Sequence, residues 1–193
     1  MLTSLCLILT LTTVPQAMPF GLTGKLMLLQ AKEVKREIRL TKEQEKAVSN
    51  FMDQAQKDPN QFGAGFDLHY PTRSLDVKAT ESLEPDQKAR LQQLFLQING
   101  LLALSEKDVS DLLGLPDETL STVKSRIKAY DKESLTLLMD VQKTRKLDKK
   151  KMKELRETAL AELAKLLTTE QTLKWTTILG EPFKFPKSLT GDR

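Results

Sequence analysis

Residues that usually carry chemistry are scarce in this chain of 193 residues, which has one cysteine, one histidine and only 5% aromatic residues. It contains no Gly-x-Ser-x-Gly sequence, the motif that presents a nucleophilic serine, and no glycine-rich loop that would cradle phosphate. The single histidine, His69, has no further ligands at the spacing that a zinc site needs. Because it lies in a loop beside Tyr70 and Pro71, we expect a solvated side chain. These absences predict a protein that is not an enzyme and that holds no metal or cofactor.

Charge is absent from the stretch Met1–Ala17, an apolar segment too short to span a bilayer comfortably. This pattern favours a secretory signal peptide over residues 1–17, released near Ala17, although no Lys or Arg precedes the apolar core and Pro15 occupies a small-residue position. A buried apolar N-terminal helix is the alternative. Cys6 lies within this segment, so a cleaved chain would have no thiol and no disulfide. We therefore expect an exported, periplasmic protein with no stable membrane span after cleavage.

The net charge of +4 permits anionic partners without requiring them. The densest basic run covers residues 143–153 and lacks the interleaved aromatic residues that would favour nucleic acid. Glu154 and Glu157 follow it directly, so a solvated helix end is a better interpretation than a nucleic-acid or anionic-lipid site.

Helix-start signals, by contrast, are repeated four times. In Leu40-Thr-Lys-Glu-Gln44, Thr41 can accept a hydrogen bond from the new helix while Gln44 reaches back to the cap residue, which is a capping box. Thr168 and Gln171 repeat this arrangement, and Pro85 and Pro116 stand where proline suits the first helical position. We expect the leucine before each cap to point into a shared core. The residues assigned to these structural caps are Leu40, Thr41, Gln44, Leu83, Pro85, Gln87, Leu115, Pro116, Leu167, Thr168 and Gln171.

Apolar periodicity near 3.6 residues predicts an all-α fold made of capped helices in hairpins. We expect helical spacing over 25–39, helices over 41–57, 74–82 and 85–99, and a short helix capped by Ser105. No Gly or Pro occurs from Asp117 to Leu179, a span of roughly 95 Å as one helix at about 1.5 Å per residue. Asp148 is a plausible cap within it, so two long helices and a last helix opened by Thr168 are predicted. An extended tail would then dock Phe183 and Phe185.

The helix starts also form two pairs along the chain. The interval from Val34 to Val109 equals that from Leu40 to Leu115, and a slightly longer interval separates Gln87 from Gln171. This spacing predicts an internal duplication within a single helical domain, 18–193, with half-repeats at about 25–100 and 105–185. Chance alignment of leucines is the alternative.

The repeated Leu-Thr-x-x-Gln elements at Leu40, Thr41 and Gln44, and at Leu167, Thr168 and Gln171, resemble those of the Spy/CpxP family of periplasmic proteins. Leu83 with Gln87 matches less fully, and Pro116 and Thr119 depart from the pattern. The resemblance implies a helical hairpin fold, often a cradle-shaped homodimer, that binds unfolded clients or tunes an envelope-stress sensor. The longer chain and its ending look more like a group of larger exported bacterial proteins with the same motif, for which no settled function is implied.

Two functions remain open from the sequence. The first is an exported, non-enzymatic helical binding protein, such as an ATP-independent chaperone or an envelope-stress accessory, with unfolded or envelope proteins as partners and no nucleic acid. The second is a structural scaffold of the cell envelope that acts by self-association.

Overall fold

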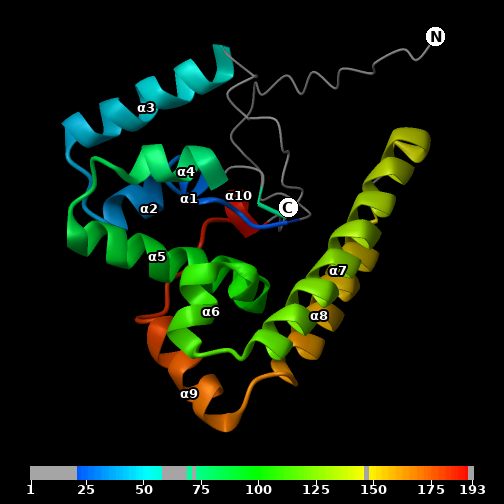
Figure 1. Ribbon diagram of the computed structural model, residues 1–193. Helices are drawn as coiled ribbons and strands as arrows, with labels where there is room; N and C mark the ends of the chain where they lie inside the picture. The colour runs from blue at the N-terminus through cyan, green and yellow to red at the C-terminus, as the bar shows by residue number, and fades with distance from the viewer. Residues whose placement is uncertain (1–20, 58–68, 71–72, 146–147, 191–193) are drawn as a thin grey trace.

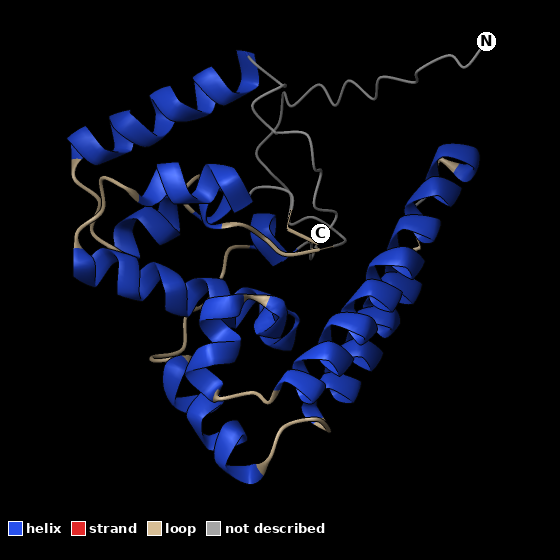
Figure 2. Cartoon of the chain, viewed as in Figure 1, coloured by secondary structure: helices blue, strands red, loops and turns tan. Residues whose placement is uncertain are grey.

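The computed structural model describes residues 21–57, 69–70, 73–145 and 148–190, and every regular element in these ranges is a helix (Figures 1 and 2). The all-α prediction is confirmed. The elements are α1 (Lys25–Leu28), α2 (Lys32–Glu37), α3 (Lys42–Lys57), α4 (Arg73–Thr80), α5 (Pro85–Asn99), the 3-10 helix η2 (Gly100–Ser105), α6 (Lys107–Leu113), α7 (Asp117–Thr144), α8 (Lys149–Ala164), α9 (Thr169–Ile178) and α10 (Lys187–Thr190).

The predicted signal peptide lies outside the described residues, as do residues 58–68 and 71–72. Among the helices that the structure describes, none combines the length and apolar character needed to cross a membrane.

The core is centred on α5 and η2. Leu91, Leu94 and Phe95 of α5 are at most 1% exposed, and Leu102 and Leu104 of η2 are fully buried. Helix η2 contacts α5, α6, α7 and α8, so four helices converge on one short element. This short element is therefore the centre around which the described helices pack.

The stretch 25–39, in which the sequence shows helical spacing, is divided into α1 and α2 at residues 29–31. Leu28 and Leu29 are adjacent and both fully buried, and the break allows both side chains to face apolar surroundings. The start of α1 is held by a distant residue, because the Asp76 carboxylate accepts from the backbone N–H groups of Lys25 and Leu26. A contact so far along the chain leaves no local signal.

Helices α7 and α8 form a long antiparallel hairpin that projects from the rest of the molecule (Figure 1). The predicted break is confirmed, since α7 ends at Thr144 and the Asp148 side chain accepts from the Lys151 N–H at 3.0 Å. Two polar contacts hold the end of the hairpin nearest the body. His69 is hydrogen-bonded to Asp131 of α7, and the Arg156 guanidinium of α8 donates to the Ile98 carbonyl at 2.8 Å. Residues 132–155, beyond these anchors, are called the distal hairpin below.

Two helix starts are displaced by one position from where the sequence predicts them. Glu106, not Ser105, is the N-cap of α6, and its ψ of 130° marks extended backbone. Pro116 is the N-cap of α7, with ψ of 150°, and Asp117 is the first helical residue. Pro85 does begin α5, as predicted.

The tail after α9 packs back on the body, as predicted. Phe183 and Phe185 rest against the core, edge to face at 5.0 Å between centroids, and the Phe183 N–H donates to the Gln97 side chain at 2.9 Å. The sequence did not indicate α10, whose Leu189 is 2% exposed.

We predict unequal costs for two glycine substitutions, measured by chemical denaturation. Gly100 has φ 60° and ψ −150°, a region that is essentially restricted to glycine, and an added Cβ would lie 3.2 Å from Leu160. Gly114 has φ 62° in ordinary left-handed geometry, and an added Cβ would meet nothing within 4 Å. Gly100→Ala should therefore cost about 2–3 kcal/mol and Gly114→Ala about 1 kcal/mol. Equal costs for the two substitutions would contradict the greater backbone strain that we assign to position 100.

Candidate functional site

The predicted cap residues build a joint between two helix starts in the first half of the chain. The Gln44 and Gln87 amides bond to each other in both directions, with nitrogen-to-oxygen distances of 2.7 and 3.0 Å. Each amide oxygen also accepts from the backbone N–H of its own cap residue, Thr41 or Glu84. The remaining donors reach the carbonyls of Ser82 and Arg39 across the joint. Every donor and acceptor of both amides is therefore used.

The second half repeats the joint with one glutamine in place of two. Thr168 and Gln171 form the predicted capping box, and the Gln171 side chain donates to the Gly114 carbonyl at 3.3 Å. When Leu40 is aligned with Leu115, Gly114 takes the place of Arg39, which receives the corresponding bond from Gln87.

The backbone before each joint also repeats. Arg39 and Gly114 are both left-handed, with φ of 55° and 62°. The N–H groups of the leucines that follow them donate to the carbonyls of Lys35 and Ser110, both at 3.0 Å, and these two acceptors are equivalent in the same alignment. This repetition of a helix ending supports the predicted duplication.

The leucines of the joints face the core, as expected. Leu83 is 3% exposed, and Leu40, Leu115 and Leu167 are half-buried against the core cluster. The cap residues thus act in holding helices together.

His69 is buried, which corrects the expectation of a solvated side chain. It is 9% exposed, with Nδ1 at 3.2 Å from an Asp131 carboxylate oxygen and Nε2 at 3.1 Å from the Leu102 carbonyl. Since the carbonyl can only accept, Nε2 carries a hydrogen. Both ring nitrogens are engaged, so this histidine ties its loop to α7 and η2.

A cluster of polar side chains continues from His69. The Tyr70 hydroxyl donates to Asp76 at 2.6 Å, while the Arg73 guanidinium lies 4.8 Å over the Tyr70 ring and binds both oxygens of Glu106. Burial, followed by the adjacent Asp76 charge, raises the pKa of Tyr70. Burial also raises the pKa of Glu106, although the ion pair with Arg73 opposes this shift. Because these side chains pair with one another, the cluster is best explained by a structural role in holding its segments together.

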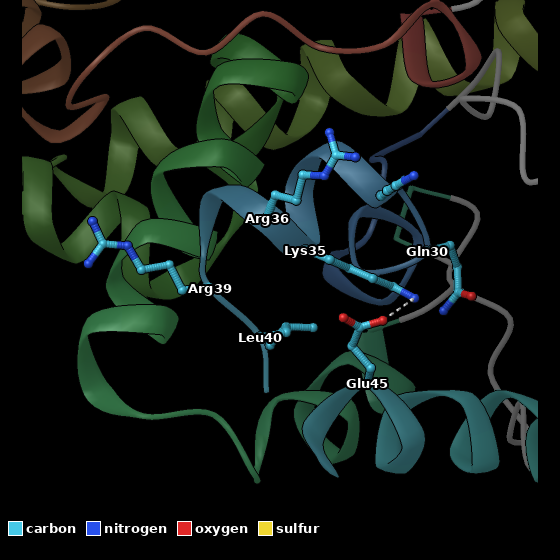
Figure 3. A pocket seen from close by; sticks show the side chains of 7 residues that line it. Gln30, Lys35, Arg36, Arg39, Leu40 and Glu45 are labelled. Atoms are coloured by element: carbon cyan, nitrogen blue, oxygen red, sulfur yellow. Dashed lines mark ion pairs between the residues drawn. The ribbon is translucent and has the colours of Figure 1, made fainter. Parts of the chain in front are cut away.

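A basic hollow lies between α2 and α3 (Figure 3). It measures about 350 Å³ and is lined by four cationic side chains, together with Gln30, Leu40 and Glu45. The cations are Lys32, Lys35, Arg36 and Arg39. In Figure 3 the Lys35 side chain extends toward Glu45, with 3.9 Å between Nζ and the carboxylate, whereas Arg36 and Arg39 extend in other directions.

Within the described ranges, no group of three or more His, Cys, Asp or Glu side chains is arranged to hold a metal ion. Comparisons with known protein families, with curated proteins and with solved structures found no match.

We predict that removing either threonine cap destabilises the protein by about 1 kcal/mol. The Thr41 and Thr168 hydroxyls each accept from the backbone N–H of the glutamine in their capping box, both at 3.2 Å. Denaturant titration of Thr41→Ala and Thr168→Ala measures this cost. If either variant kept full stability but lost partner binding, the element would be a recognition motif instead.

A second prediction concerns the amide pair. In Gln87→Glu the carboxylate loses both donors and faces the Arg39 carbonyl and the Gln44 oxygen, so we expect a cost of about 2 kcal/mol at pH 7. The protonated carboxyl at position 87 regains one donor, so the folded protein favours the protonated form. The folded-state pKa of this carboxyl is therefore raised. The deficit relative to the unaltered protein should therefore be smallest below the unfolded-state pKa of about 4.3 and complete above the folded-state pKa.

Gln171→Glu provides the matched control, because its amide nitrogen has only the 3.3 Å bond to Gly114. Its cost should be about half as large. If the two variants lost the same stability, the larger stabilising contribution that we assign to the Gln87 amide would be contradicted.

Proposed function

We propose that this chain is an exported, non-enzymatic helical binding protein that captures unfolded polypeptide without ATP, and that the distal hairpin is its capture surface. The uncharged apolar N-terminal stretch and the Leu-Thr-x-x-Gln elements support export and this class of protein. A role as an envelope-stress accessory, in which the captured chain is the signal, belongs to the same proposal.

The observation that carries the proposal is the apolar surface of the distal hairpin. Met139 is 54% exposed, and Leu137, Leu138 and Val141 are half-buried. A helix normally buries its apolar stripe against another layer, and two helices alone provide only one contact face each. The remaining apolar surface is therefore available to a bound segment.

The positive charge of the protein is concentrated at the same place. Residues 132–155 contain eight Lys or Arg and four Asp or Glu, a net charge of +4 that equals the net charge of the whole chain. The remainder of the molecule is thus neutral overall. Lys150 and Lys153 are strongly exposed, with 88% and 75% of their side chains accessible.

These charges favour a foreign anionic segment over a second copy of this chain. Two distal hairpins placed side by side would bring two surfaces of +4 together, and repulsion between like charges opposes that association. An acidic, partly apolar segment is attracted over a distance and then held by burial, which is non-directional and requires no single sequence. Release would follow from weak binding or from folding of the client.

We predict suppression of aggregation that does not depend on ATP, is stronger for anionic than for cationic clients and weakens as salt rises. At about 0.15 M salt the Debye length is about 8 Å, so the attraction should fall steeply above that concentration. Light scattering of reduced or heated model proteins, with and without the purified chain, measures the effect.

Two variants with the same change in net charge locate the surface. Replacing Lys150, Lys151 and Lys153 by Gln should weaken suppression, whereas replacing Lys42, Lys46 and Lys124, which are also exposed, should preserve it. If stoichiometric protein leaves scattering unchanged for both anionic and cationic clients at low salt, capture fails. The scaffold function, tested by concentration-dependent self-association, would then take first place.

A further inference from the structure

The cations of the basic hollow between α2 and α3 are mostly unneutralised. Across the described residues, the side chains of Lys32, Arg36 and Arg39 form no hydrogen bond or ion pair, and the single acidic wall residue, Glu45, lies 3.9 Å from Lys35. By comparison, the nearby Arg90 side chain is matched to Glu37 at 2.7 Å.

This concentration of charge opposes folding locally. Lys32, Lys35 and Arg36 lie on one face of α2, on which like charges three or four positions apart repel one another. Arg39 also has φ of 55°, a left-handed conformation that favours glycine over residues with a side chain. The last-turn positions of Lys35 and Arg36 suit the dipole of α2, but this stabilisation accounts neither for Lys32 in the first turn nor for an arginine at position 39.

The second half of the chain shows that the joint does not need these cations. With Leu40 aligned on Leu115, the equivalents of Lys35, Arg36 and Arg39 are Ser110, Asp111 and Gly114. The same backbone ending and the same glutamine-to-carbonyl bond form there without them. The cations at positions 35, 36 and 39 are thus particular to the first half, whereas Lys32 has a lysine, Lys107, as its equivalent.

We propose that this hollow binds a phosphate-bearing anion, with Lys32, Arg36 and Arg39 supplying the positive charge. The guanidinium of arginine matches two oxygens of a phosphate at once, and lysine adds a compact point charge. The volume of about 350 Å³ lies at the small end of ligand sites, which begin at about 300 Å³, and accommodates a diphosphate or a phosphate headgroup. Because Arg36 and Arg39 extend freely, binding draws their side chains inward over the anion.

The site is separate from the capture surface of the distal hairpin, so its test does not depend on the proposed chaperone function. Isothermal titration of the full chain with inorganic pyrophosphate at low ionic strength should show saturable binding. Arg39→Gly and Lys32→Gln should each weaken it by about tenfold. Arg39→Gly should also leave the melting temperature unchanged or raise it, since glycine suits the left-handed backbone. Loss of binding without loss of stability separates a ligand role from a structural one.

Matched controls are available for both variants. Arg145→Gly relieves the other left-handed arginine, with φ of 54°, and Lys107→Gln alters the residue that is equivalent to Lys32 in the second half. Neither should change pyrophosphate binding.

Vesicles distinguish the two sources of the phosphate group. Co-sedimentation with vesicles of phosphatidylcholine containing phosphatidylglycerol, lost in Arg39→Gly and absent with pure phosphatidylcholine, would assign a lipid headgroup. Binding of pyrophosphate alone would assign a soluble ligand. If neither probe binds, or if the controls weaken binding as much as Arg39→Gly and Lys32→Gln do, the proposal is wrong.

Discussion

The reciprocal amide pair of Gln44 and Gln87 is the constraint on which the first half of the molecule depends. Two helices begin close together here, and the first N–H groups of a helix have no partner within the helix itself. Each amide satisfies its own helix start and still has a donor and an acceptor directed at the other helix. Local capping and tertiary packing are thus carried by the same two side chains, so loss of one amide affects both levels.

The joint also determines the backbone that precedes it. Gln87 donates to the Arg39 carbonyl, and that carbonyl is presented because residue 39 is left-handed. The second half reaches the same geometry with Gly114 and the single amide of Gln171. The joint therefore requires a left-handed backbone at this position and not a particular side chain. Position 39 can carry a charged residue, at the energetic cost of a left-handed arginine.

Local signals predicted those parts of the fold that local physics determines. Thr168 with Gln171, and Asp148, depend on groups close by in the sequence, and their roles were visible there. The division of 25–39 was not visible, because Asp76 of α4 holds the start of α1.

Burial of His69 was missed for a similar reason. Its partners, Asp131 and the Leu102 carbonyl, lie far along the chain, in α7 and η2. The basic hollow had a partial signal, since its four cations occur at helical spacing. Only the fold shows that these cations line one hollow and that a single carboxylate faces them.

The distribution of charge differs between the two halves of the chain, although a glutamine-to-carbonyl bond forms the joint in both. A packed helical body gains little from unpaired cations on its surface, because exposed charges contribute little to stability even when paired. In this chain the side chains of Lys32, Arg36 and Arg39 at the hollow have no partner among the described residues. The distal hairpin carries a net charge of +4, although Lys150 and Lys153 lie 3.7 and 3.8 Å from Glu154 and Glu157. Elsewhere, Arg90 with Glu37 and Arg126 with Glu162 show the ordinary pairing of such residues. Since the second joint forms without the cations of the first, and the joints do not include the distal hairpin, neither basic surface is a requirement of folding. We propose that each surface is kept for what it attracts, a small phosphate group at the hollow and an acidic polypeptide at the hairpin.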